Sequence, residues 1–443
     1  MAKAPVNKNK PNIIILFADD LGYGDLACYG SKGIKTPHLD QMAEDGMRFT
    51  DFYVSAASCT PSRASLMTGV YAARIGLEKV VDDLSTTGLS AAELTIADYL
   101  KQDGYKTAIF GKWHLGHHPE FMPRQHGFDE FFGIPYSMDM WPFHPKPSHH
   151  YPAIPLYHNE EVIEYNPNVN TLTQRLTHKT IDFIKSHKDQ PFFVYVPYPL
   201  PHVPLGASEQ FRGKSKAGLY GDAVMEIDWS AGQIVKVLKD LKIEENTLLL
   251  FSSDNGPWLS YGNHGGSAGQ LREGKGTTFD GGHRVPFIAQ MPGTIPAGST
   301  CRELASTLDL LPTILEITNQ TLHQPVDGKS IYPLLTTPLA NTPYEAFFFM
   351  NGRRVEAIRA GKWKLHVPHR YRIVETPGHD GQPGNQNNHG GSIGLALYNI
   401  EKDKAEKNNV AQQHPDVVKR LTQLILDFEY DILKNSRAAG SVK

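Results

Sequence analysis

Short apolar runs alternate with amphipathic segments of helical period along the first part of this chain, and this alternation constrains the fold more than any other feature. The predicted strands span 12–17, 105–110, 192–196 and 247–251. The predicted helices span 36–46, 95–102, 172–187 and 220–241. Continuous apolar runs of this length are typical of strands buried on both faces. The sequence therefore predicts an α/β fold in which helices flank a mostly parallel sheet.

The pattern changes after Pro333. The later strand candidates span 345–350, 355–359, 363–367 and 395–399, and the last amphipathic helix spans 417–430. Closely spaced strands with one helix predict a smaller antiparallel subdomain, so we divide the chain into domains 1–338 and 339–443. Two further segments, 141–155 and 378–391, are rich in turn-forming residues and are predicted to be long loops.

Composition excludes several classes of protein. The 44 basic and 47 acidic residues give a net charge of -3, so no nucleic-acid partner is expected, because such a partner requires a positive excess. No apolar run approaches the roughly 20 residues that span a bilayer. Three cysteines are too few for a disulfide framework. The N-terminus is basic but has no apolar core, so it is not an intact signal peptide, and both a cytosolic protein and an exported one with its signal removed stay open.

Acidic clusters follow two of the predicted strands. Asp19 and Asp20 come after the first strand, and Asp254 and Asn255 come after the strand at 247–251. Ligands of open parallel sheets bind beyond the carboxyl ends of the strands. Carboxylate and amide oxygens suit Ca²⁺ or Mg²⁺ and do not suit Zn²⁺. The alternative for each pair alone is a helix cap or a turn.

Cys59 stands where a helix is predicted to begin. Pro61 fits the first turn of that helix, so the Cys59 side chain would face exposed backbone N–H groups, which favour anions. Arg63 lies one helical turn further on and can reach back toward the same point. A buried cysteine acting as a small apolar residue is the alternative interpretation.

Four other cationic or titratable residues lie in positions that favour a site. Lys112 and His114 follow the strand at 105–110. His202 lies in a proline-stiffened loop after the strand at 192–196, where a structural role is an equal alternative. Lys275 has glycine on both sides, which suggests a backbone that approaches an anionic ligand, although a solvated surface lysine is the other interpretation.

These motifs together resemble the type I sulfatase family. Cys59 is followed two residues later by Pro61 and four residues later by Arg63, and the similarity continues through Gly69. The other matching segments, in chain order, are 12–25, 111–116, 253–256 and 274–277. The resemblance implies an alkaline-phosphatase-like mixed sheet with a smaller C-terminal subdomain. One departure is His283 in the segment 281–284, where Val or Ile is more usual.

The resemblance also implies a set of site residues. Cys59 would be oxidised to formylglycine and would ligate Ca²⁺, with Mg²⁺ as the less favoured ion, together with Asp19, Asp20, Asp254 and Asn255. The remaining catalytic positions would be Arg63, Lys112, His114, His202 and Lys275. Ser137 matches a hydrogen-bonding position, and His366 resembles a substrate-pocket histidine from the C-terminal subdomain.

The expected activity is hydrolysis of sulfate monoesters, with a sulfated carbohydrate favoured over small aryl sulfates. One hydroxyl of hydrated formylglycine would attack sulfur, His202 with help from Lys275 would protonate the leaving alcohol, and His114 would deprotonate the second hydroxyl. The alternatives are a phosphate or phosphonate ester hydrolase of the same superfamily and, with Cys59 unmodified, a calcium-dependent glycan-binding protein.

The resemblance further implies partners and a compartment. A formylglycine-generating or anaerobic sulfatase-maturating enzyme would convert Cys59, and a periplasmic, secreted or lysosomal location is expected. The two predicted loops could line a saccharide cleft. The candidate sugar contacts in the first loop are Trp141, His149, His150 and Tyr151.

Overall fold

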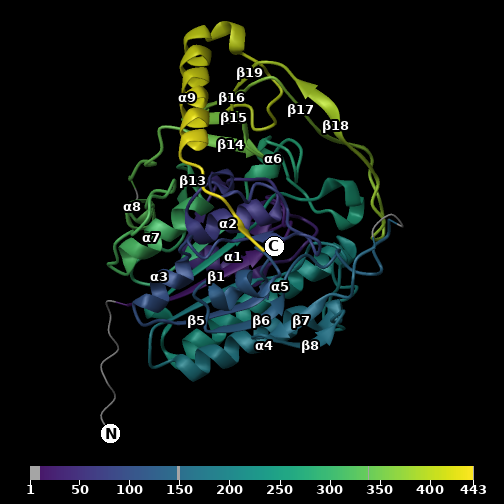
Figure 1. The fold of residues 1–443 in the computed structure, drawn as a ribbon, viewed down its shortest axis with the longest axis vertical. Helices are drawn as coiled ribbons and strands as arrows, with labels where there is room; N and C mark the ends of the chain where they lie inside the picture. The colour runs from purple at the N-terminus through teal and green to yellow at the C-terminus, as the bar shows by residue number, and fades with distance from the viewer. Residues whose placement is uncertain (1–9, 147–149, 338, 443) are drawn as a thin grey trace.

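A ten-stranded sheet forms the centre of the protein, in the order β12-β2-β11-β10-β1-β9-β5-β6-β7-β8 (Figure 1). The computed structural model describes residues 10–146, 150–337 and 339–442. The strands are β12 (Ser299–Cys301), β2 (Met47–Phe49), β11 (Phe287–Gln290), β10 (Thr247–Ser253), β1 (Asn12–Ala18), β9 (Phe192–Pro197), β5 (Lys106–Lys112), β6 (Glu130–Ile134), β7 (Pro155–His158) and β8 (Glu161–Tyr165). The adjacent strands from β10 to β6 run parallel, which confirms the predicted fold class.

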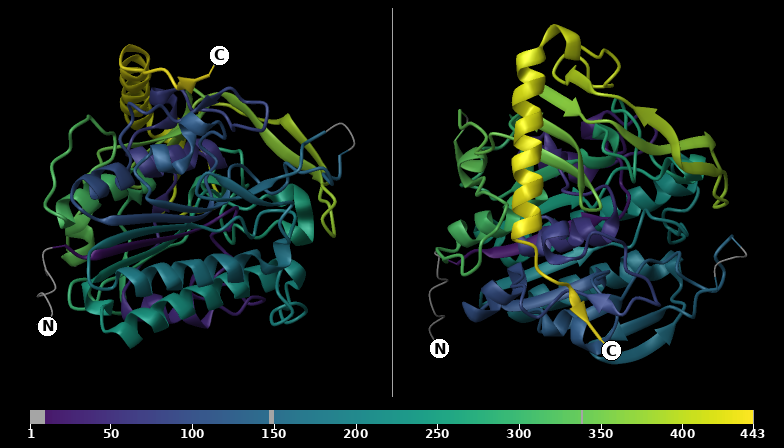
Figure 2. Two further views of the ribbon diagram at one scale, coloured as in Figure 1. Left: turned by 60° about the horizontal axis from the view of Figure 1, so that its bottom comes forward. Right: turned by 45° about the horizontal axis from the view of Figure 1, so that its top comes forward.

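Successive residues of β1 point into two separate cores. Ile13, Ile15 and Phe17 belong to one core, which also contains residues of α2, α3, α7 and α8. Ile14 and Leu16 belong to the other, which is covered by α1, α4 and α5. Figure 2 shows α4 and α5 side by side beneath the sheet in its left view. The helices are α1 (Pro37–Asp45), α2 (Cys59–Thr68), α3 (Ile96–Gln102), α4 (Val169–His187), α5 (Gly218–Leu241), α6 (Asp280–His283), α7 (Leu310–Ile317) and α8 (Tyr332–Thr336). Burial on both faces explains why the central strands are continuous apolar runs.

The strands and helices predicted before Pro333 begin and end within three residues of the observed ones. Thr95 closes a capping box with Asp98 at the start of α3, as expected for a threonine in that position. The start of α4 was predicted three residues too late. The side chain of Asn168 accepts a hydrogen bond from the N–H of Asn170 and caps the helix, which therefore begins at Val169.

The C-terminal part is a four-stranded antiparallel sheet packed on one long helix, as predicted. The elements are β14 (Phe347–Asn351), β15 (Arg354–Ala360), β16 (Trp363–His366), β19 (Ala396–Asn399) and α9 (Pro415–Lys434). The pairing of β20 (Gly440–Ser441) with β4 (Thr87–Gly88) connects the C-terminal part to the rest of the chain. A second short pairing, β13 (Ala305–Ser306) with β3 (Phe52–Tyr53), lies within the first domain. The domain boundary between 338 and 339 stays a prediction.

The prediction of a long loop at 378–391 is wrong. Most of this segment is the turn and the second strand of an antiparallel hairpin, formed by β17 (His369–Thr376) and β18 (Asn385–Ile393). Figure 1 shows the hairpin extending from the C-terminal sheet down the side of the molecule. Asparagine and glycine dominate β18 and have low strand propensity, so pairing with β17 stabilises this strand where its own sequence does not.

A cluster of fully buried charges joins the C-terminal sheet to the central domain. Nζ of Lys364, in β16, lies 2.8 Å from Oδ1 of Asp280 in α6 and 2.9 Å from Oε1 of Glu406. Burial alone would raise the pKa of both carboxyls, but Lys364 and other cations nearby lower both below their ordinary values. A carboxyl whose pKa is lowered by folding stabilises the folded state at any pH above its pKa in the unfolded chain, which is about 4. This stabilisation is lost as the pH falls from there through the pKa of the folded state.

We expect Lys364→Met to lower the free energy of unfolding by about 3–5 kcal/mol, because it leaves Asp280 and Glu406 buried without their lysine. Urea unfolding at pH 7 followed by tryptophan fluorescence measures the change. The control is Lys362→Met, which removes the same charge from an exposed position two residues away and should change stability by less than about 0.5 kcal/mol. Equal effects of the two substitutions would contradict the role assigned to the cluster.

Candidate active site

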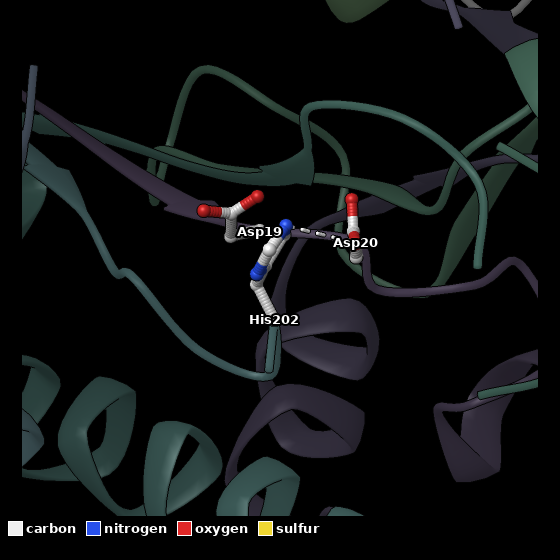
Figure 3. Close-up of side chains that lie close together, drawn as sticks. All are labelled: Asp19, Asp20 and His202. Atoms are coloured by element: carbon white, nitrogen blue, oxygen red, sulfur yellow. Dashed lines mark ion pairs between the residues drawn. The ribbon is translucent and has the colours of Figure 1, made fainter. Parts of the chain in front are cut away.

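The sheet brings the two acidic clusters together. Ala18, the last residue of β1, pairs with Ser253, the last residue of β10, so the residues that follow both strands leave the sheet at the same edge. The backbone N–H of Asp20 donates to Oδ1 of Asp254 at 3.0 Å. The loop after β9 brings His202 to the same place, with its Nε2 3.5 Å from Oδ2 of Asp20 (Figure 3).

Metal-ligand atoms converge at this edge. Atoms of Asp19, Cys59 and Asp254 lie within 4.8 Å of one another, and so do atoms of Asp19, Asp20 and His202. Oδ1 of Asp19 and Oδ1 of Asn255 are buried and have no hydrogen-bond partner among the described residues. Buried oxygens without a partner are costly, and a cation satisfies them. The predicted ligands therefore fit a hard divalent cation, as the oxygen-rich donor set requires.

Helix α2 positions Cys59 and Arg63. The helix begins at Cys59 after an extended Ser58, and all of its side chains are buried. Arg63 donates to Oδ2 of Asp254 from Nε at 3.0 Å and from Nη2 at 2.8 Å. Burial raises the pKa of the Cys59 thiol above its ordinary value, so an unmodified Cys59 would be a neutral and weak nucleophile.

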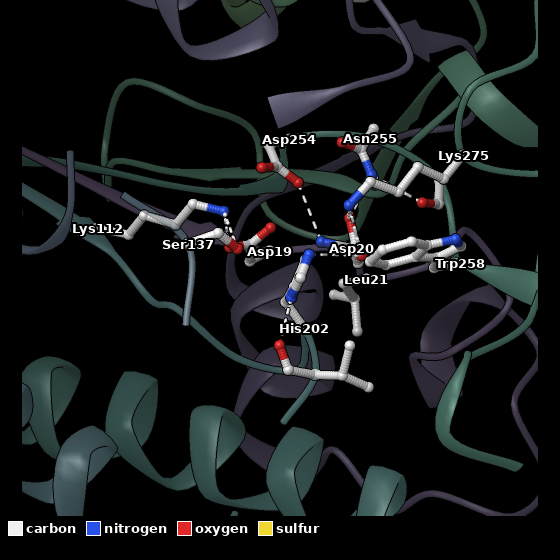
Figure 4. A network of polar contacts seen from close by, with 12 residues as sticks. Asp19, Asp20, Leu21, Lys112, Ser137, His202, Asp254, Asn255, Trp258 and Lys275 are labelled. Carbon is white, nitrogen blue, oxygen red and sulfur yellow. Dashed lines mark hydrogen bonds and ion pairs between the residues drawn. The ribbon is translucent and has the colours of Figure 1, made fainter. Parts of the chain in front are cut away.

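Lys112 and Ser137 lie at the ends of two neighbouring strands, β5 and β6. Lys112 ends β5, and its Nζ lies 2.5 Å from Oδ2 of Asp19 and 3.3 Å from Oγ of Ser137, in the loop after β6 (Figure 4). Burial tends to raise the pKa of Asp19, but Lys112 and other nearby cationic groups bring it below its ordinary value. Burial and the negative charge of Asp19 raise the pKa of Asp254. The cations of this centre therefore stabilise the charged form of Asp19 and do not do so overall for Asp254.

His114 is arranged as a base. Its Nε2 lies 2.9 Å from the backbone oxygen of Val81, so this nitrogen carries the proton and donates it. Its Nδ1 is buried and has no hydrogen-bond partner among the described residues. Burial lowers the pKa of His114 well below its ordinary value, and the charges of Lys112 and Arg63 lower it further. At neutral pH the ring is uncharged, with a free electron pair on Nδ1.

His202 and Lys275 both contact Asp20. Nδ1 of His202 donates to the backbone oxygen of Val203 at 2.6 Å, so any further proton is held on Nε2, which faces Asp20. Nζ of Lys275 lies 2.7 Å from Oδ1 of Asp20 and 4.4 Å from the ring centre of Trp258. Burial alone would lower the pKa of Lys275, but Asp20 and its acidic neighbours raise it above the ordinary value, so the lysine stays charged.

The structure does not bring His366 into this cluster. His366 is fully buried in β16, and its Nε2 lies 2.8 Å from Oε1 of Glu406. Trp141 and Tyr151 pack against the core that lies between the sheet and helices α4 and α5. His150 is exposed, and His149 lies outside the described residues. The roles of these residues in sugar binding stay predictions.

Sequence reasoning missed two residues near the cluster. Trp258 contacts the ring of His202, with ring centres 5.3 Å apart, as well as Lys275. Burial tends to raise the pKa of the Asp139 carboxyl, but the positive charges of His202 and Lys275 bring it below its ordinary value. Trp258 follows Asn255 by three residues, and Asp139 follows Ser137 by two. This closeness to predicted site residues is the sequence feature that could have identified them.

Comparisons with known proteins agree with this geometry. The sulfatase family profile matches residues 11–320, and the profile for the C-terminal region of aryl-sulfatase matches 342–442. Human (Homo sapiens) arylsulfatase A is 39% identical, over 94% of this chain and 87% of its own length. N-acetylgalactosamine-6-sulfatase of Canis lupus familiaris is 40% identical, over 80% of this chain and 71% of its own length.

A solved structure from a study of glycosaminoglycan metabolism by Bacteroides thetaiotaomicron has a TM-score of 0.83 at 29% identity, covering 95% of this chain and all of its own. No helix among the described residues is long and apolar enough to cross a membrane. The matched profiles together span most of the chain, and the motif residues from Asp19 to Lys275 meet in one buried centre. The chain therefore belongs to the sulfatase family and is a hydrolase of sulfate esters.

Proposed function

We propose that the protein removes sulfate from a sulfated carbohydrate, with formylglycine derived from Cys59 as the nucleophile and Ca²⁺ as the bound ion. The observation that carries the proposal is the position of Cys59, at the start of α2, where its sulfur and carboxylate oxygens of Asp19 and Asp254 lie within 4.8 Å of one another. The galactosamine sulfatase at 40% identity and the glycosaminoglycan-related structure support a carbohydrate substrate.

The proposed ion would be held by Asp19, Asp20, Asp254 and Asn255 together with residue 59. Ca²⁺ is favoured over Mg²⁺ because Ca²⁺ accepts a larger and less regular set of oxygen ligands, whereas Mg²⁺ demands a small, nearly ideal octahedron and usually keeps several waters. When bound, the ion supplies positive charge that polarises the nucleophile and the sulfuryl oxygens.

The residues of the chain supply the rest of the chemistry. Arg63, Lys112 and Lys275 place fixed positive charge around the position where the sulfuryl group would be transferred. Nδ1 of His114 can accept a proton at residue 59, because its electron pair is free and the ring is neutral. Nε2 of His202 can hold the proton that the leaving alcohol needs, because Val203 fixes the proton on the other nitrogen.

The proposed activity is tested with matched esters of one alcohol. We expect the purified, matured protein to release sulfate from a sulfated N-acetylhexosamine and from nitrophenyl sulfate. We expect kcat/KM for the phosphate monoester of the same phenol to be lower by a factor of at least about 100, since the phosphate carries a further negative charge near Asp19 and Asp254. Faster turnover of the phosphate would contradict the proposal and favour a phosphoryl-ester hydrolase.

Maturation of Cys59 is part of the proposal and has its own readout. Conversion of the thiol to the aldehyde lowers the intact mass by about 18 Da. We expect this change after co-expression with a formylglycine-generating or anaerobic sulfatase-maturating enzyme, and catalytic activity in proportion to the converted fraction. Full activity at the unconverted mass would exclude formylglycine.

We also propose a periplasmic, secreted or lysosomal location for the protein.

His202 should affect the rate in a manner that depends on the leaving group. We expect His202→Ala to lower kcat/KM by about 100-fold on a sugar sulfate and by tenfold or less on nitrophenyl sulfate, because an activated phenol departs without a proton. Steady-state kinetics on both esters measures this difference. Equal losses on both substrates, with S–O cleavage limiting the rate for each, would contradict the assignment and favour Lys275 as the acid.

A further inference from the structure

The β17–β18 hairpin of the C-terminal subdomain lies beside the turn that contains Lys275. The N–H groups of Gly378 and Gly384, near the hairpin tip, both donate to the backbone oxygen of Ser260 at 2.8 Å. Nε1 of Trp258 donates to Oε1 of Gln386, in β18, at 3.2 Å. The hairpin is thus attached to the segment that follows the Asp254-Asn255 pair.

Arg372, in β17, contacts this turn directly. Its Nη1 donates to the backbone oxygen of Lys275 at 3.3 Å, and its Nε donates to Oδ1 of Asn388 at 2.9 Å. Gly276 has a φ of 79°, and a Cβ at this position would lie 2.7 Å from Nη1 of Arg372. Only a residue without a side chain allows the guanidinium to lie against the backbone here.

The same turn also borders the nucleophile. The N–H of Gly276 donates to the backbone oxygen of Ala57, two residues before Cys59, at 2.8 Å. Lys275 and Arg372 line one pocket together with Trp258 and Gln386. Arg372 therefore stands at the wall of the active site, on the side formed by Lys275.

The guanidinium of Arg372 forms no ion pair among the residues that the structure describes. The buried guanidinium groups of Arg63, Arg284 and Arg359 each form an ion pair with an aspartate at 2.6–2.8 Å. Arg372 is half-buried, yet it forms no ion pair with any carboxylate in the described parts of the chain, and its Nη2 has no hydrogen-bond acceptor there. A partly desolvated arginine with a free N–H edge is a strong binder of carboxylates and sulfates.

We propose that Arg372 binds a second anionic group of the substrate, carried by the sulfated sugar itself or by the sugar linked to it. This inference rests on the proposed function and narrows it to saccharides with two negative charges near each other. The second group is either a carboxylate, as in a uronate, or another sulfate. A substrate with one sulfate alone would leave Arg372 without a partner.

The test compares three substrates in the parent and in Arg372→Gln. The substrates are N-acetylgalactosamine 6-sulfate, its disaccharide with a uronate, and the 4,6-disulfated sugar. We expect the parent to favour at least one of the doubly charged substrates, and we expect the substitution to reduce that preference in kcat/KM by about tenfold to a hundredfold. The preferred partner shows whether the second group is a carboxylate or a sulfate. Turnover of the monosulfated sugar should change by less than about threefold.

Arg370→Gln is the matched control, because it removes the same charge from an exposed position on the same strand and should leave all three rates unchanged. Arg372→Lys should restore part of the preference. An unchanged preference in Arg372→Gln, or an equal change in Arg370→Gln, would overturn the inference while leaving the sulfatase activity established.

A protein that hydrolyses none of the three sugars would instead contradict the proposed carbohydrate substrate. In that case calorimetry decides the role of Arg372. The dissociation constants of the three saccharides are measured for the Cys59→Ala protein and for the double variant that also carries Arg372→Gln. The ratio between the doubly charged and the monosulfated saccharides is then compared between the two proteins. An unchanged ratio would overturn the inference.

Discussion

Replacement of Cys59 by alanine is expected to lower sulfate release by about 10⁴-fold or more, the scale of loss seen when a catalytic nucleophile is removed. Alanine offers neither an aldehyde nor a thiol at the start of α2. No group among the surrounding cations could then accept the sulfuryl group. The fold should be nearly unaffected, with a change in unfolding free energy of about 1 kcal/mol, because one small buried side chain is replaced by another of similar size. Sulfate release and urea unfolding measure the two effects.

Cys301→Ala is the control for this experiment. Cys301 is also a free cysteine, but it lies in the edge strand β12, away from the acidic cluster. The control should retain activity within about twofold. Residual turnover in Cys59→Ala within tenfold of the parent would contradict a covalent role for residue 59.

Removal of the divalent ion should have the second largest effect. Exhaustive chelation is expected to lower activity by at least about 100-fold, because the ion contributes charge that no side chain replaces. It should also lower the melting temperature, because the ion binds the folded state and because Asp19, Asp20 and Asp254 then face one another without it.

Ca²⁺ added back should restore both activity and melting temperature, and Mg²⁺ should restore them less. The control is a sample treated with chelator already saturated with Ca²⁺, which should behave as the parent. Elemental analysis that finds zinc at full occupancy would contradict the oxygen-ligand argument.

Local sequence patterns determined the layers of the fold. Period and length distinguish helices from strands, and continuous apolar runs identified the strands with two buried faces. The same patterns placed Asp19, Asp254 and Lys112 at strand ends, and topology then requires strand ends of a parallel sheet to meet at one edge. The β17–β18 hairpin escaped prediction because β18 has no apolar alternation and depends on its partner strand.

The tertiary structure alone decided the chemistry of individual atoms. The free nitrogen of His114 depends on Val81 and that of His202 on Val203, and sequence carries no information about which carbonyl a ring will meet. His366 and Arg372 show the same limit: pairing with Glu406 buries His366 in the C-terminal sheet, whereas hairpin geometry brings Arg372 to Lys275. The last two contacts join residues 40 and 97 positions apart. They depend on packing distances of a few ångströms, which composition, spacing and periodicity do not encode.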